Sequence, residues 1–173
     1  SDIKELTVKF TKSDGALGQV AVSGPFDAMK QEGRLKIDVT GIGNEVLSLV
    51  GAKSGLNFGG TKLAANCEVE LKNNAKTINT TGTLTGDKFS LRRGPLSGPT
   101  LDIRLDYSVA VDLPKSSARI RSFSLSATQS GRPLLTAALS KEMALDWGKG
   151  AEAVDESALE LAINQLNLAD WRT

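Results

Sequence analysis

The sequence predicts an all-β fold, an antiparallel sheet of long, strongly twisted strands with one short helix. Residues 101–113 alternate apolar and polar side chains without a break, which is typical of a strand with one apolar and one polar face. Hairpin-length turns join about ten such segments, and no strand–helix–strand rhythm of a parallel sheet occurs. Long strands with one apolar face need a cover, so we expect either a curled sheet or a two-layer sandwich.

The segment 101–113 is the clearest strand, and at about 3.3 Å per residue it would extend roughly 43 Å. Its apolar side chains share one phase of the alternation: Leu101, Ile103, Leu105, Tyr107, Val109, Val111 and Leu113. Residues 63–71 alternate in the same way, with Leu63, Val69 and Leu71 on the apolar side. Further strands are expected at 6–10, 20–22, 35–39, 76–84, 88–91, 119–129 and 135–147.

Turn and bulge signals separate these strands. Asp14-Gly15 favours a tight hairpin, and Gly86-Asp87 predicts a second tight turn. Within 119–129 the apolar phase slips between Ile120 and Phe123, which predicts a β-bulge.

One helix is expected at Asn44–Val50. Val46, Leu49 and Val50 stand at helical spacing, with Asn44 as the N-cap and Gly51 as the stop. Such a helix would cover one end of the sheet.

The last segment, 159–166, fits two structures. Leu159, Leu161 and Ile163 alternate as in a strand. Ser157 with Glu160 forms a capping-box pattern, and the apolar spacing from Leu159 to Leu166 also fits a helix face.

Composition excludes several function classes. The 173 residues carry a net charge of +1, so no general positive field attracts nucleic acid. The chain has no histidine and one cysteine, which removes a Ser-His-Asp triad, a thiolate metal cluster and an internal disulfide. We expect no metal, no cofactor and no enzymatic activity.

Weaker chemical patterns have simpler structural explanations. Gly41-Ile42-Gly43 lacks the third glycine of a dinucleotide fingerprint. Asp102, Asp106 and Asp112 share the polar face of the long strand, where cross-strand ion pairs are commoner than a glycosidase pair.

Aromatic and sulfur side chains also fit structural roles. Trp147 is in phase with Met143 and Leu145, which predicts core packing, whereas Trp171 stands alone near the end of the chain. Cys67 is in phase with Val69 and Leu71, which predicts a small buried hydrophobe.

Four segments resemble the strand pattern of AsmA-like proteins of the Gram-negative envelope: 20–27 (VAVSGPFD), 33–42 (GRLKIDVTGI), 108–113 (SVAVDL) and 159–171 (LELAINQLNLADW). This resemblance favours the strand at 159–166. It implies a non-enzymatic periplasmic domain involved in outer-membrane biogenesis, with an apolar groove that contacts or moves phospholipid. It also implies a parent protein anchored in the inner membrane, of which 1–173 is one β-rich domain cut from a longer chain, with neighbouring modules as partners.

Under that hypothesis the groove lining would comprise Leu101, Ile103, Leu105, Tyr107, Val109 and Val111, followed by Leu63, Val69 and Leu71. The alternative for all nine is ordinary core, since buried alternating faces are common in sheets. An alternative function is an adhesin-like or carbohydrate-binding β-sandwich, which requires a closed core and an exposed aromatic platform that includes Trp147 or Trp171.

Overall fold

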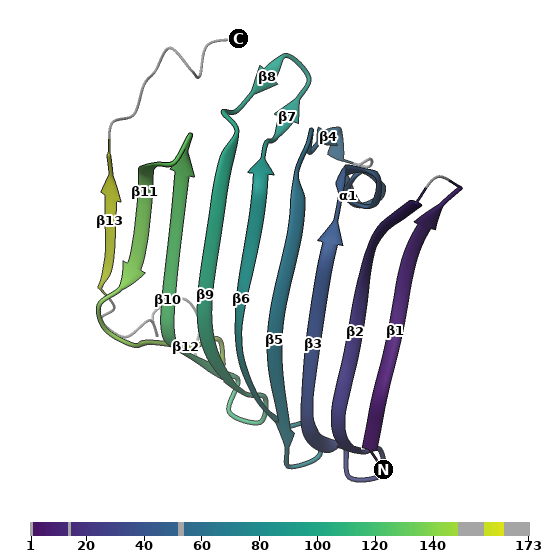
Figure 1. Ribbon diagram of the computed structural model, residues 1–173. Coiled ribbons are helices and arrows are strands. Elements are labelled where there is room, and N and C mark those ends of the chain that lie inside the picture. The colour runs from purple at the N-terminus through teal and green to yellow at the C-terminus, as the bar shows by residue number, and fades with distance from the viewer. Residues whose placement is uncertain (1, 14, 52–53, 149–157, 165–173) are drawn as a thin grey trace.

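In a computed structural model of the chain, the described residues are 2–13, 15–51, 54–148 and 158–164. Ten of their strands form one antiparallel sheet in the order β1-β2-β3-β5-β6-β9-β10-β11-β13, with β12 also paired to β10 (Figure 1). The sheet strands are β1 (Asp2–Lys12), β2 (Gly15–Asp27), β3 (Glu32–Ile42), β5 (Lys62–Lys72), β6 (Thr77–Phe89), β9 (Leu101–Asp112), β10 (Ser117–Gln129), β11 (Arg132–Leu139), β12 (Met143–Asp146) and β13 (Leu159–Ile163). The all-β antiparallel prediction is confirmed.

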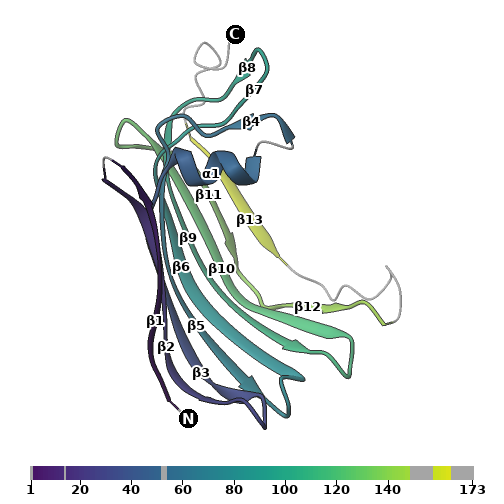
Figure 2. The ribbon, with the colours of Figure 1, turned by 90° about the vertical axis from the view of Figure 1, so that its right-hand side faces the viewer.

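The sheet is curled, as the view along it from β1 shows (Figure 2). The strands bend so that their lower ends turn toward the side on which α1 (Asn44–Gly51) lies. A small sheet of β4 (Leu56–Asn57), β7 (Arg92–Arg93) and β8 (Leu96–Ser97) lies at the upper end. In the described part of the chain no second large sheet packs on the first, so of the two expected architectures the curled sheet is the one formed.

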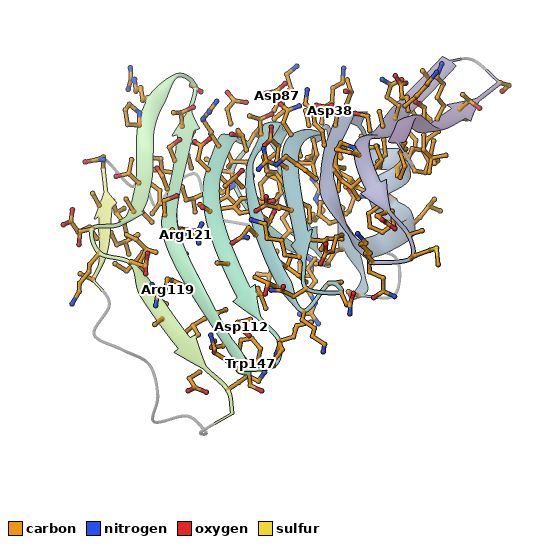
Figure 3. All side chains as sticks on the ribbon, turned by 90° about the horizontal axis from the view of Figure 1, so that it is seen from below. Asp38, Asp87, Asp112, Arg119, Arg121 and Trp147 are labelled. Carbon is orange, nitrogen blue, oxygen red and sulfur yellow. The ribbon has the colours of Figure 1, made fainter. Side chains whose placement is uncertain are left out.

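Register puts the apolar side chains of neighbouring strands on one face. Leu105 of β9 stands opposite Leu84 of β6 and Leu125 of β10, and the same phase continues through β5 to Val39 of β3. This face is the concave one, because α1 lies on that side and the preceding Ile42 is buried. The side chains that alternate with these apolar ones are polar, and Figure 3 shows one of them, Asp38, on the convex side.

The helix begins at Asn44, the residue that was predicted to be its N-cap. The Gly43 carbonyl accepts the Leu47 N–H at 3.0 Å, so Gly43 is the N-cap. Asn44 is the first helical residue, and its side chain accepts the Ser48 hydroxyl at 3.0 Å instead of capping the backbone. The helix ends at Gly51, as predicted, where an added Cβ would lie 2.8 Å from the Leu56 carbonyl oxygen.

The predicted hairpin, bulge and closing strand are confirmed. β1 and β2 pair directly across the turn, with Lys12 opposite Gly15. The register of β9 and β10 shifts between Ile120 and Ser122, where one extra residue restores the apolar phase at Phe123. Residues 159–163 form β13 and not a helix; residues 165–173 lie outside the described part.

The predicted turn at Gly86-Asp87 is wrong, because β6 runs on to Phe89. The strand bulges there instead: Lys88 has a φ of 50°, and its N–H donates to an Asp102 carboxylate oxygen at 2.9 Å. A Cβ on Gly86 would lie 2.8 Å from Cγ1 of Ile103, so the glycine provides space for neighbouring side chains.

Two strands approach each other unusually closely at Gly24 of β2. Its φ is +128°, and an added Cβ would lie 2.2 Å from the backbone oxygen of Arg34 in β3. Gly33 opposes the same stretch, with an added Cβ only 2.3 Å from the Pro25 oxygen. These contacts involve backbone atoms, which a rotamer change cannot relieve.

We therefore expect Gly24→Ala to lower the free energy of unfolding by about 2–4 kcal/mol, from steric overlap plus unfavourable φ. Denaturant unfolding followed by circular dichroism measures it. Gly60→Ala is the matched control, because nothing lies within 4 Å of a Cβ there. Equal effects of the two substitutions would contradict this explanation.

Candidate functional site: the concave apolar face

The nine residues singled out from the sequence lie on the concave face in adjacent rows. Leu63, Gly86 and Ile103 form one row across β5, β6 and β9. Two further rows are Val69–Thr80–Val109 and Leu71–Ile78–Val111. The remaining members, Leu101, Leu105 and Tyr107, share the phase of Ile103 along β9.

The face extends beyond the predicted residues to both edges of the sheet. Register adds side chains from β1, β2, β3, β10, β11 and β13: Leu6, Val8, Val20, Val22, Leu35, Ile37, Val39, Phe123, Leu125, Leu135, Ala137, Leu161 and Ile163. Each follows the same alternation that identified β9. The sequence therefore held the signal, but strand order was needed to show that the stripes join.

Most of this face is only partly covered. Among the described residues, the buried apolar side chains are Ile42, Ala127, Leu134 and Ala137. The six candidates on β9 are all half-buried, whereas Leu6 on β1 and Leu161 on β13 are 59% and 60% exposed. Among the described residues, apolar side chains reach the burial of a closed core only at Ile42 before α1 and in the small cluster where β10 meets β11.

A polar group interrupts the centre of the face. The Tyr107 hydroxyl donates to Sγ of Cys67 at 3.2 Å, and that sulfur lies 3.2 Å from the Thr80 hydroxyl. The ring lies across Gly82, whose added Cβ would come within 2.9 Å of the Tyr107 oxygen. Cys67 is thus half-buried and hydrogen-bonded, whereas a small buried hydrophobe was predicted.

Tyr107 is the only tyrosine of the chain, so its titration can be followed directly. The hydrogen bond to Cys67, together with burial, raises the pKa of Tyr107 above its ordinary value of 10.0. The neutral phenol is the form that the fold favours. Its contribution to stability is present below about pH 10 and is lost as pH rises through the folded-state pKa.

We expect ultraviolet absorbance to show phenolate formation above pH 10 in the folded protein, and Cys67→Ala to bring the pKa back toward 10. Circular dichroism at each pH ensures that the chain is still folded. A midpoint at the ordinary value, unchanged by Cys67→Ala, would contradict the hydrogen bond.

The three aspartates of β9 lie on the other, convex face, and each has a structural partner. Arg104 and the Thr83 hydroxyl hydrogen-bond Asp106 and hold its pKa below the ordinary value. Lys115 does the same for Asp112 at 2.8 Å, and Asp102 accepts the Lys88 N–H. A general acid needs a raised pKa, whereas the ion pairs of Asp106 and Asp112 lower theirs.

Trp147 is 53% exposed, so the prediction of core packing is wrong. β12 ends at Asp146. The backbone N–H of Trp147 then donates to the backbone carbonyl of Ser116 at 2.9 Å, beside the β9–β10 turn (Figure 3). A sugar-binding platform would need further aromatic side chains here, and Trp171 lies outside the described residues.

No group of three or more potential metal ligands occurs among the described residues. Nor does any helix there reach the length and hydropathy needed to cross a membrane. Comparison with family models, with curated proteins and with solved structures gave no significant match. The site must therefore be interpreted from its geometry.

Proposed function

We propose that this chain is a non-enzymatic periplasmic domain of an AsmA-like envelope protein, and that its concave face contacts or conducts phospholipid. The observation that carries the proposal is a wide apolar face that the described residues leave largely uncovered. Water contact with so much apolar surface is unfavourable at about 25 cal/mol per Å², so a ligand of matching chemistry is stabilised there. Acyl chains fit such a face because they need no specific hydrogen bonds.

The distribution of polar groups supports the same function. Ion pairs such as Arg34–Glu70 and Arg104–Asp106 lie on the convex side, where the carboxylate in each pair has a lowered pKa. The concave face instead holds the hydrogen-bonded group of Tyr107, Cys67 and Thr80. In the part of the chain that the structure describes, the ion pairs lie on the convex side and none lies on the concave side, a distribution that suits a carrier of acyl chains in water.

Three features of the sequence and fold favour an AsmA-like parent. Long antiparallel strands, short turns and the curled shape agree with what the family resemblance implies, and the resembling segments 20–27 and 33–42 lie on neighbouring strands β2 and β3. Periplasmic location, an inner-membrane anchor on the parent and contact with neighbouring modules belong to the same proposal.

Native mass spectrometry with lipid extraction, on protein purified from a bacterial envelope, tests the proposal. We expect phospholipid to co-purify with the chain. If the chain carries no lipid and takes up none from detergent-solubilised phospholipid, the proposed function is wrong, and the domain is better regarded as an interaction module.

A further inference from the structure

The exposed large apolar side chains of the described residues are not scattered over the molecule. Five lie on the concave face of the two edge strands: Leu6, Val8, Leu159, Leu161 and Ile163. The other six are Met29, Leu49, Leu91, Leu96, Leu113 and Trp147. These six lie outside the large sheet, and two groups account for all of them.

The first group lies along the lower ends of the strands, which we name the lower lip: the turns 28–31, 73–76 and 113–116, and Trp147 after β12. Met29 is 95% exposed in turn 28–31, and Leu113 is 49% exposed in turn 113–116. Trp147, beside turn 113–116, is 53% exposed. The second group, the upper lip, comprises α1, β4 and residues 91–97, which include the β7–β8 hairpin. It carries Leu49, Leu91 and Leu96, and both lips project to the concave side of the sheet (Figure 2).

Cations accompany the apolar side chains on both lips. Each turn of the lower lip has an exposed lysine: Lys30, Lys76 and Lys115. Arg92 and Arg93 stand exposed between Leu91 and Leu96 on the upper lip. The chain as a whole has a net charge of only +1, so this pairing of cations with exposed apolar residues is local.

Three acidic side chains beside the lower lip hold its turns in place. Asp27 accepts the backbone N–H groups of Met29 and Lys30, and Glu32 accepts the N–H of Asn73. Asp112 accepts the N–H of Lys115 and pairs with its ammonium at 2.8 Å. Each of these carboxylates belongs to the first or last residue of a strand, whereas Met29, Leu113 and the three lysines lie within the turns.

We propose that the two lips dock the open side of the curled sheet onto the surface of an anionic phospholipid bilayer. Leucine, methionine and tryptophan insert at the boundary between headgroups and acyl chains, and lysine and arginine attract anionic headgroups. The concave face would then lie against its source of lipid. This inference deepens the proposed function and rests on it.

Co-flotation with vesicles tests the inference. We expect the wild-type chain to float with vesicles of phosphatidylcholine and phosphatidylglycerol, and much less with phosphatidylcholine alone. Leu113→Ser with Trp147→Ser should lower the bound fraction by about tenfold, and so should Leu91→Ser with Leu96→Ser. Arg92→Gln with Arg93→Gln should reduce it severalfold, as expected for losing two surface cations.

Lys36→Gln with Arg104→Gln is the matched control for the loss of two surface cations. Each of these side chains is 57% exposed, but both belong to the polar, convex phase of β3 and β9, outside both lips. The control should float like the wild type, and circular dichroism verifies that every variant is folded. Equal loss in the control would mean non-specific adsorption and overturn the inference, as would equal flotation with phosphatidylcholine alone or none at all.

Native mass spectrometry of the same variants separates the two proposals. Lip variants that still carry lipid but no longer float would confirm docking as a distinct property. A wild-type chain that carries lipid and does not float would overturn docking and leave the proposed function in place.

Discussion

Leu105→Asp is expected to lower the phospholipid bound per chain by at least about tenfold while the chain stays folded. A charged side chain among acyl chains costs about 2.5–3.5 kcal/mol on insertion scales. Leu105 lies in the middle of the concave face, between Leu84 and Leu125. Because it is only half-buried, the charge can reach water in the lipid-free state, and we expect a loss of stability of about 1–2 kcal/mol. Native mass spectrometry and denaturant unfolding measure the two effects.

Ala110→Asp on the same strand is the control. Ala110 stands on the convex face opposite Asn79 and Arg119, so a carboxylate there should leave lipid binding unchanged. Equal lipid loss in both variants would mean that lipid binding does not depend on the concave face. Unfolding of Leu105→Asp would mean that this stripe is closed core.

Ala127→Asp is expected to have the opposite outcome and to destabilise the fold by about 3 kcal/mol or more. Ala127 is 3% exposed and stands between Ile103 and Leu135 in the ladder. A buried carboxylate without a partner is costly, and its desolvation cannot be relieved without opening the junction of β10 and β11. Thermal unfolding followed by circular dichroism measures the loss.

Ala127→Ser separates charge from size at this position, and we expect it to cost about 1 kcal/mol. If Ala127→Asp is tolerated as well as Leu105→Asp, the distinction between a small buried cluster and a half-buried face is wrong.

Local patterns in the sequence predicted most of the fold. Alternation identified the long strands, and helical spacing with Gly51 identified α1. The slip between Ile120 and Phe123 identified a bulge, because two successive residues then share one face. These features depend on neighbours in sequence, so they can be found without a structure.

Features that depend on distant segments could not be found in this way. Gly86 looked like a turn residue, yet it makes room for Ile103 and Leu63 from the two adjacent strands. Trp147 continued the phase of β12, but the strand ends one residue earlier. Likewise, nine candidate residues could be named, but only strand order joins them to β1 and β13 on one face.

The reactivity of Cys67 tests the central claim most directly. It is the only cysteine of the chain and lies half-buried on the concave face beside Tyr107. If acyl chains occupy that face, phospholipid should slow alkylation of Cys67 by a maleimide by about tenfold or more relative to the lipid-free protein. A cysteine placed on the convex side, Ser108→Cys in a Cys67→Ala background, should react at the same rate in both states. Equal rates for Cys67 with and without lipid would contradict the account.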